Sequence, residues 1–284
     1  MKIGFIGLGA MGGSLARNII RSSYDVIVYD ISEKAIENTV NIGGKAAASA
    51  HEVAEQADVL FTSLPLPQHL KDLLIEKDKI LDDMQENSLI IDVSTVDPKT
   101  ARELSTASEA KNVKFLACPL GKGPSQAEEG EAAFFVGGKE KVFSEYKDFL
   151  TSISTSVNHL GDVEQATAFK LISNMIGMTN TLVLAEGVRL ADKIGIDPEL
   201  FQKLLSRTGA DSYQLTLRGP MFLNEDYTSK FSVNLTLKDI ALGVKMAESI
   251  EQITPFSSLA KDYYKKAQDL GYGNEDCAAA YKLF

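Results

Sequence analysis

Glycines with the spacing of a phosphate-binding turn stand at the start of the chain. Residues 2–6 form an apolar run typical of a buried strand, and Gly7, Gly9 and Gly12 follow where a helix would begin. The first glycine permits a tight turn, the second lets backbone N–H groups approach a pyrophosphate, and the third allows the helix to pack closely on the strand. The helix N-terminus carries free N–H groups and a partial positive charge, which bind anions. The sequence therefore predicts a dinucleotide site at Gly7, Gly9, Ala10, Met11 and Gly12.

An acidic residue stands about twenty positions beyond the glycines, at the end of a second apolar run. That run is 26–29, and Asp30 follows it. A carboxylate there can accept hydrogen bonds from the adenosine ribose and would repel a 2′-phosphate, which favours NAD over NADP. Lys34 keeps NADP open as a second cofactor. In an alternative interpretation, Asp30 caps a helix that begins near Ser32.

Length and composition limit the remaining interpretations. A chain of 284 residues exceeds the usual size of one domain, so we expect two domains with separate cores. Hydrophobic residues at 44% and charged residues at 24% are typical of a globular protein, and no apolar run reaches the length of a membrane span. The net charge of −10 argues against nucleic acid as a partner. Cys118 and Cys277 lie far apart without metal-ligand neighbours, which predicts free thiols, no metal site and a cytoplasmic location.

Apolar runs alternate with amphipathic stretches through the first half of the chain. Four of these runs are typical of strands between helices: 59–62, 89–92, 113–116 and 133–136. Such alternation predicts an α/β fold with a mainly parallel, doubly wound sheet of the Rossmann type. Ligands of such sheets lie beyond the carboxyl ends of the strands. The candidate binding residues are therefore those that follow the runs, at 64–65, 92–95 and 119–123.

The second half of the chain changes to helical periodicity. Apolar residues recur at helical spacing from about 165 to 193, and Gly195 would end that helix as a C-cap. Asp197-Pro198 and Thr254-Pro255 each place a capping residue before a proline that can start a helix, and 234–251 is another amphipathic run. We therefore expect an all-α C-terminal domain.

The change in pattern marks a domain boundary. We place it near Gly161, so that 1–161 is the dinucleotide-binding domain and 162–284 is the helical domain. The helix predicted at 165–193 would then be a long interdomain helix at the start of the second domain.

Six short segments match one known family in sequence order. They are 7–18, 92–95, 119–130, 170–174, Phe231 with 237–239, and 271–273 with Asp276. These segments resemble the β-hydroxyacid dehydrogenases, which include 3-hydroxyisobutyrate dehydrogenase and tartronate semialdehyde reductase. The resemblance covers nearly the whole chain. It implies hydride transfer between NAD and a small β-hydroxy acid, a helical domain that serves substrate binding and dimerisation, and a homodimer or homotetramer.

The resemblance also implies catalytic residues on the long helix. Lys170 matches the family's catalytic lysine, which removes the hydroxyl proton in oxidation and returns it in reduction. Asn174 lies four residues later on the same helical face, so its amide could hold the substrate hydroxyl or orient the lysine. Lys238 and Asp239 match a pair that the family places near the nicotinamide, with an exposed helical ion pair as the alternative. By spacing alone, Lys170 would be an ordinary solvated charge.

Two turns after predicted strands also match the family. Ser94 and Thr95 could donate their hydroxyls to the substrate and to the nicotinamide ribose respectively, or they could cap the helix expected after Asp97. Leu64 and Pro65 match a turn that lines the cofactor. We therefore assign Ser94 to the substrate, and Thr95, Leu64, Pro65 and Lys238 to the cofactor.

The loop expected to bind the substrate departs from the common family pattern. That pattern has an acidic residue at Ala117 and serine followed by glycine where this chain has Gly121 and Lys122. A glycine followed by a basic residue is similar to the 3-sulfolactaldehyde reductases of the same family, in which the basic side chain holds the sulfonate. The resemblance thus implies an anion clamp at Gly121, Lys122 and Gly123. In the alternative interpretation, Lys122 projects into water.

A second departure comes before the catalytic lysine. The family usually has glycine at the positions of Glu164 and Ala166. The added carboxylate of Glu164 could pair with Lys122, disfavour anionic substrates, or be solvated, and the sequence leaves these three open.

The resemblance implies an NAD-dependent oxidoreductase. Its reaction would interconvert a small β-hydroxy acid, or a sulfonate analogue such as sulfolactaldehyde, with the corresponding aldehyde or ketone. An imine reductase is one alternative, because that family shares the glycine turn and the long helix, although it usually has another residue at the position of Lys170. A dinucleotide-binding sensor without turnover is the other alternative, because the altered loop and Glu164 permit it.

Overall fold

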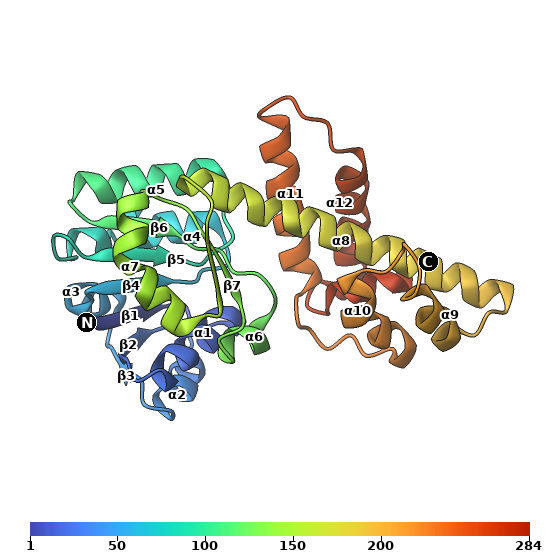
Figure 1. Ribbon diagram of the computed structural model, residues 1–284, viewed down its shortest axis with the longest axis horizontal. Helices are drawn as coiled ribbons and strands as arrows, with labels where there is room; N and C mark the ends of the chain where they lie inside the picture. The colour runs from blue at the N-terminus through green and yellow to red at the C-terminus, as the bar shows by residue number, and fades with distance from the viewer. The chain divides into compact units, whose positions relative to one another are not determined.

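A six-stranded parallel sheet forms the centre of the N-terminal part of the chain (Figure 1). The computed structural model describes residues 1–284. The sheet has the order β3-β2-β1-β4-β5-β6, so the direction of winding reverses between β1 and β4. Open α/β sheets bind ligands at such a switch point, beyond the carboxyl ends of the strands. The strands are Lys2–Ile6 (β1), Asp25–Tyr29 (β2), Lys45–Ala46 (β3), Val59–Thr62 (β4), Leu89–Asp92 (β5) and Lys114–Ala117 (β6).

Helices cover both faces of this sheet because alternate strand residues point to opposite sides. Ile3 and Phe5 of β1 belong to the core under α1 and α7, whereas Ile6 belongs to the core under α3, α4 and α5. The helices of the first face are α1 (Ala10–Arg21), α2 (Glu33–Val40) and α7 (Glu140–Ile153). Those of the second face are α3 (Ala50–Gln56), α4 (Pro67–Lys71) and α5 (Pro98–Ala110), with the short turns η1 (Asp72–Glu76) and η2 (Ile80–Asp82). The predicted doubly wound Rossmann fold is therefore confirmed.

One predicted strand lies outside the main sheet. The run at 133–136 forms β7 (Ala133–Val136), which pairs in parallel with β8 (Ser156–His159) in a separate two-stranded sheet. The reason is a reversal of the chain after β6, because Ala117 makes antiparallel backbone hydrogen bonds with Gly137 and Leu120 pairs in the same antiparallel sense with Phe134. The short helix α6 (Pro124–Glu128) lies between β6 and β7.

The C-terminal part contains only helices and turns (Figure 1). The helix predicted at 165–193 is α8 (Val163–Ile194), and Gly195 follows it with φ +88°. The Asp197 side chain caps α9 by accepting from Leu200 N–H, whereas the side chain of Thr254 makes no capping hydrogen bond to α12. The remaining elements are α9 (Pro198–Leu205), α10 (Tyr213–Asn224), α11 (Val233–Glu248), α12 (Pro255–Ala267), η3 (Gln268–Tyr272) and η4 (Cys277–Leu283).

The chain divides into two compact units, Met1–Lys170 and Leu171–Phe284. This division falls inside α8, whereas the boundary that we propose from the sequence, near Gly161, falls at the turn before α8. None of the helices combines the length and the apolar character needed to cross a membrane.

A buried ion pair connects three segments of the C-terminal unit. Asp276 is fully buried, and its Oδ1 accepts from Nε of Arg218 on α10 at 3.2 Å. Its Oδ2 accepts the backbone N–H groups of Lys230 and Phe231, each at 2.9 Å. Arg218 is only 3% exposed, so the two charges compensate each other away from water. The carboxylate therefore fixes α10, the segment before α11 and the start of η4 together.

Replacing Arg218 by leucine should destabilise the protein strongly. The substitution leaves the Asp276 carboxylate buried without its counter-charge, a change that typically costs about 3–5 kcal/mol. Urea unfolding followed by circular dichroism should show that loss. The exposed Arg207, replaced in the same way, should change the free energy of unfolding by less than about 0.5 kcal/mol. A loss at Arg218 no larger than the loss at Arg207 would show that the pair is unimportant.

Candidate cofactor and substrate site

The three glycines of the first turn meet three different surroundings. Gly7 has φ +93°, and a Cβ there would lie 2.2 Å from the carbonyl oxygen of Ser63. A Cβ on Gly12 would lie 2.0 Å from the carbonyl oxygen of Gly7. A Cβ on Gly9 would meet nothing within 4 Å. Two glycines are thus required by packing inside the protein, and Gly9 faces open space of the kind that a pyrophosphate needs.

The N-terminus of α1 is open to an anion. Gly9 is its N-cap, and no side chain caps the helix. The N–H groups of the first turn, at Ala10, Met11 and Gly12, have no intrahelical acceptor. Gly9 and Ala10 are exposed, so these donors can reach a ligand. The residues present therefore fit a dinucleotide phosphate group.

Asp30 stands at the carboxyl end of β2, beside the glycine turn. Its Oδ2 accepts Leu8 N–H at 2.6 Å, and its Oδ1 accepts Ser32 N–H at 2.8 Å. The N-cap of α2 is Ser32, whose hydroxyl accepts Ala35 N–H, so Asp30 is not the helix cap. Each carboxylate oxygen retains a further lone pair that could accept a ribose hydroxyl.

The turns after β4 and β5 are joined by side-chain hydrogen bonds. Ser94 Oγ accepts Leu64 N–H at 2.9 Å and donates to Asp92 Oδ1 at 2.6 Å. Ser94 is only 4% exposed, so donation to a substrate would require its hydroxyl to leave Asp92. Thr95 is half-buried. The N-cap of α5 is Asp97, so neither hydroxyl has the capping role considered above.

Leu64 and Pro65 follow β4 at the same edge of the sheet. The Leu64 side chain is half-buried and comes close to Gly7, because a Cβ on that glycine would lie 3.1 Å from Leu64 Cδ2. Pro65 is exposed. The structure thus brings the residues assigned to the cofactor from the N-terminal unit together at one edge of the sheet.

The loop after β6 holds a lysine in a strained backbone conformation. Lys122 is exposed and has φ +64°, in the left-handed region that favours glycine. A non-glycine residue there is strained by about 1–3 kcal/mol. Six other non-glycine residues, Lys79 and Glu251 among them, also have positive φ, so this conformation is not specific to the predicted site. On one side, a Cβ on Gly121 would lie 2.9 Å from the Phe135 ring. On the other side, Gly123 is the N-cap of α6.

An ion-pair cluster ties this loop to the helix that begins at the glycine turn. Glu128 of α6 accepts from Arg17 of α1 at 2.6 Å and from Arg21 of α1 at 2.8 Å. The Arg17 guanidinium, and secondly that of Arg21, holds the pKa of Glu128 at about 2, although partial burial works in the opposite direction. This cluster was not predicted from the sequence, because only the four-residue spacing of the two arginines is visible locally.

Glu164 is half-buried and pairs with Arg102 rather than with Lys122. It accepts a hydrogen bond from Nε of Arg102 on α5, and its other oxygen is buried without a hydrogen-bond partner. The carboxylate therefore ties the first turn of α8 to α5 within the N-terminal unit.

A buried carboxylate connects the predicted residues of the C-terminal unit. Asp239 is 1% exposed, and its Oδ2 accepts from Asn174 Nδ2 at 2.6 Å. Nζ of Lys238 lies 2.8 Å from Asp239 Oδ1, and that lysine side chain is only 15% exposed. This pair is thus not the exposed helical ion pair of the alternative interpretation. Because Asp239 accepts from the Asn174 amide nitrogen, the amide oxygen points away as an acceptor.

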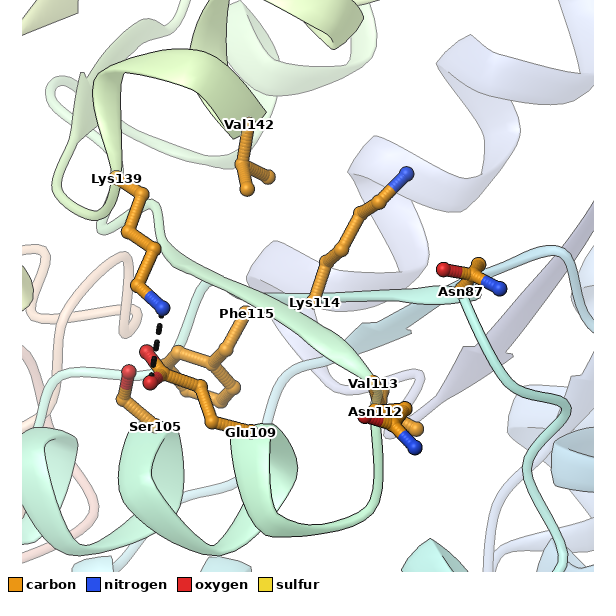
Figure 2. Close-up of a pocket in the computed structure, with 9 residues that line it drawn as sticks. All are labelled: Asn87, Ser105, Glu109, Asn112, Val113, Lys114, Phe115, Lys139 and Val142. Atoms are coloured by element: carbon orange, nitrogen blue, oxygen red, sulfur yellow. Dashed lines mark ion pairs between the residues drawn. The ribbon is translucent and has the colours of Figure 1, made fainter.

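The pocket drawn in Figure 2 lies at the amino ends of β5 and β6, opposite to the carboxyl ends that carry the predicted cofactor site. It has a volume of about 310 Å³ and is lined by residues from the end of α5, the start of β6 and the start of α7. The ion pair of Lys139 with Glu109, 2.9 Å long, crosses it. None of the predicted site residues lines this pocket, and the amino ends of parallel strands are not where such sheets bind ligands.

Comparison with known proteins agrees with this geometry. A family model described as the NAD binding domain of 6-phosphogluconate dehydrogenase matches residues 2–161. Another, described as NAD-binding of NADP-dependent 3-hydroxyisobutyrate dehydrogenase, matches residues 165–284. A probable mitochondrial 3-hydroxyisobutyrate dehydrogenase of Dictyostelium discoideum is 31% identical over 98% of this chain and 89% of its own length. This chain belongs to the β-hydroxyacid dehydrogenase family.

Further known proteins are similar over most or all of this chain. Glyoxylate/succinic semialdehyde reductase 2 of Arabidopsis thaliana is 30% identical over 98% of this chain and 78% of its own length. The solved 3-hydroxyisobutyrate dehydrogenase of Salmonella typhimurium has a TM-score of 0.92 and 26% identity, with both chains covered completely. A solved imine reductase from Pseudomonas, at 19% identity and a TM-score of 0.66, shares the fold alone.

Membership establishes the class of enzyme. This β-hydroxyacid dehydrogenase is an NAD(P)-dependent oxidoreductase whose N-terminal unit is a dinucleotide-binding domain. The roles of individual side chains stay predictions, including that of Lys170, which lies half-buried in α8 at the end of the N-terminal unit.

Replacing Gly9 by alanine should weaken cofactor binding without disturbing the fold. The added methyl group meets no protein atom but occupies the space next to the first turn of α1. We expect the Kd for NADH, measured by fluorescence titration, to rise roughly tenfold, which corresponds to about 1.4 kcal/mol. Gly209→Ala is the matched control, because its Cβ also meets nothing within 4 Å and it lies in the other unit. Equal NADH affinity in both variants would refute the assignment of Gly9.

The Glu128 cluster should make stability depend on acid pH. In the unfolded chain this carboxyl takes up a proton near its ordinary pKa of 4.5, whereas in the folded protein it stays ionised down to about 2. Its contribution is therefore fully present above about pH 5 and is lost as the pH falls toward 2. Urea unfolding between pH 6 and 3 should show a shallower decline for Glu128→Gln than for the wild type. Parallel profiles would contradict the role of the two arginines.

Proposed function

We propose that this dehydrogenase interconverts a small β-hydroxy acid, or its sulfonate analogue such as sulfolactaldehyde, with the corresponding aldehyde or ketone. The observation that carries the proposal is Lys122, an exposed cation held at φ +64° between Gly121 and Gly123. The two flanking glycines leave room for an anionic group to approach the ammonium group and the backbone, which supports an anion clamp over a lysine that only projects into water.

The proposed cofactor is NAD, with NADP as the weaker substitute. Asp30 places a negative charge beside the glycine turn, where the additional phosphate of NADP would be repelled. The next residue, Ile31, is 95% exposed and cannot form an ion pair with a phosphate. An apolar side chain so placed could instead pack against an adenine.

The proposed chemistry divides between the cofactor and the chain. When bound, the nicotinamide accepts or supplies the hydride. Lys170 removes the hydroxyl proton of the alcohol during oxidation and donates it to the developing alkoxide during reduction. Asn174 is oriented by its hydrogen bond to Asp239, so that its amide oxygen can accept from the substrate hydroxyl or from an ammonium group. Both relatives described above bear the names of enzymes that act on short carboxylates, which supports this substrate class.

We also propose a cytoplasmic location and a homo-oligomeric state for this protein. Cys118 and Cys277 are both buried and unpaired, which supports a reducing compartment such as the cytoplasm. A homodimer or homotetramer is expected from the family resemblance.

A substrate panel tests the proposal directly. Oxidation of NADH and NADPH would be followed with succinic semialdehyde, tartronate semialdehyde, methylmalonate semialdehyde and 3-sulfolactaldehyde. We expect NADH to be preferred, Lys122→Ala to raise KM for the best substrate about tenfold, and Lys170→Ala to reduce kcat about 10²-fold or more. Lys141→Ala, which removes an exposed lysine from α7, is the control and should change neither constant.

The outcomes distinguish a sulfonate substrate from a carboxylate substrate. A preference for sulfolactaldehyde that is lost in Lys122→Ala supports the clamp. A preference for a carboxylate semialdehyde with no effect of Lys122→Ala would show that Lys122 projects into water and does not bind the substrate. The sulfonate substrate would then be excluded. NADH binding without turnover of any substrate would favour the sensor, and turnover of cyclic imines alone would favour the imine reductase.

A further inference from the structure

The loop that contains Lys122 is held against β7 by backbone hydrogen bonds. Gly121 N–H donates to the Ala133 carbonyl oxygen at 2.8 Å, and Phe135 N–H donates to the Pro119 carbonyl oxygen at 3.2 Å. The residues on both sides of these bonds form an antiparallel pair, so the loop follows any movement of the strand. The position of the proposed anion clamp is therefore set by β7.

The ring of Phe135 fills the space beside the first glycine of the clamp. Successive strand residues point to opposite sides, and Phe134 and Val136 belong to the buried core, so Phe135 points away from that core. A Cβ on Gly121 would lie 2.9 Å from Cζ and 3.0 Å from Cε2 of the ring. The ring is thus in contact with the clamp backbone, and no side chain fits between them.

The same ring also contacts α8. The ring centroids of Phe135 and Phe169 are 4.6 Å apart, and their planes are inclined by 60°, within the range of favourable aromatic pairs. Phe169 is 42% exposed, although it is a large apolar residue, and it directly precedes Lys170. The Phe135 ring therefore lies against the clamp and against the neighbour of the proposed acid/base.

The end of β7 holds the start of α8 in place. A Cβ on Gly137 would lie 2.5 Å from the Asp162 carbonyl oxygen and 2.7 Å from Ala166 Cβ. Gly138 N–H donates to the Gly161 carbonyl oxygen at 2.9 Å. The first turn of α8 consequently has little freedom to shift relative to the strand, and the Phe135 ring bridges two elements that the same strand fixes.

We propose that Phe135 is a specificity-determining residue that sets the length of the substrate. The inference rests on the proposed function, in which Lys122 binds the anionic end and Lys170 meets the hydroxyl group. A substrate engaged at both lysines must span the separation between the clamp and the start of α8. The Phe135 ring, which contacts both elements, fixes that separation.

The expected consequence is discrimination between substrates that differ by one methylene group. Discrimination of one methylene in a pocket typically amounts to about 10–200-fold. In a β-hydroxy acid, one methylene group separates the carbinol carbon from the anionic group, whereas a γ-hydroxy acid has two. Without the ring, the loop and the helix can adopt more than one separation, and both lengths are accommodated.

Calorimetric titration of hydroxy anions into the NADH complex tests the proposal. The probes are 3-hydroxypropionate and 4-hydroxybutyrate, and the sulfonates 2-hydroxyethanesulfonate and 3-hydroxypropane-1-sulfonate. Cofactor and probes are both in the reduced form, so no hydride transfer accompanies binding. For the anionic group that binds more tightly, the wild type should bind the shorter probe about tenfold more tightly than the longer one. Phe135→Ala should bring the two Kd values to within about threefold of each other.

Control variants separate this role from a general loss of structure. Phe135→Ala should leave the Kd for NADH within about twofold of the wild type, because the glycine turn does not contact the ring. Phe256→Ala, at a phenylalanine that is 77% exposed in the other unit, should keep the length preference. Should Phe135→Ala weaken NADH binding by misfolding, Phe169→Ala removes the second ring and leaves β7 intact. It should lower the length preference in the same direction.

A second substitution tests the contact with Gly121. The methyl group of Gly121→Ala has no room beside the ring, so this variant should bind the shorter probe about tenfold more weakly than the wild type. In the Phe135→Ala background the same methyl group occupies the vacated space and should change the Kd by less than about twofold. Equal effects of Gly121→Ala in both backgrounds would show that the ring does not position the clamp.

Three results would overturn the proposal. They are a wild type without a length preference, a folded Phe135→Ala variant that keeps the wild-type preference, and a wild type that binds none of the four probes. The proposed function fails separately: if the length preference depends on Phe135 but no aldehyde of the substrate panel is reduced, the site binds hydroxy anions without the proposed turnover. Turnover of a panel substrate with an unchanged preference in Phe135→Ala would refute this inference alone.

Discussion

The close approach of two backbone segments at the glycine turn is the constraint on which the N-terminal unit depends. The turn passes so near Ser63 that neither Gly7 nor Gly12 has room for a Cβ. That contact fixes β1 against β4 at the switch point of the sheet. From there, the Ser94 hydroxyl connects the turn after β4 to Asp92, and Cys118 N–H donates to the Asp92 carbonyl oxygen. Fixed hydrogen bonds thus extend from the glycine turn across the carboxyl edge to the start of the loop that contains Lys122.

Buried carboxylates organise both units in a similar way. Asp92 accepts from the Thr62 and Ser94 hydroxyls at the edge of the sheet. Asp276 holds Arg218 and two backbone N–H groups, and Asp239 holds the Asn174 amide. A carboxylate accepts several hydrogen bonds at once, so one residue can set the orientation of groups that are distant in sequence. Two of these carboxylates contact predicted site residues: Asp92 holds the Ser94 hydroxyl, and Asp239 holds the Asn174 amide.

Local patterns were sufficient to predict the main elements. The strands at 59–62 and 89–92 and the helix at 165–193 follow from uninterrupted apolar periodicity, and the glycine turn follows from its spacing. The run at 133–136 is a strand as predicted, but its pairing with β8 outside the main sheet follows from a chain reversal after β6 that no local pattern signals. The partners of Glu128 and Glu164 are 62 or more residues away in sequence, so neither pair was accessible to spacing arguments. The Ser94 hydroxyl donates to Asp92, only two residues away, but the direction of a hydroxyl depends on its burial at the sheet, which spacing does not reveal.

The left-handed backbone of Lys122 bears on how variants at this position would behave. Glycine adopts φ +64° without strain, so replacing the lysine by glycine would relieve the backbone at that point. The same left-handed backbone occurs at Lys79, Glu225 and Glu251, so it does not by itself mark a functional residue. A glycine at position 122 would remove the charge while easing the fold, which separates the chemistry of the side chain from the stability of the loop.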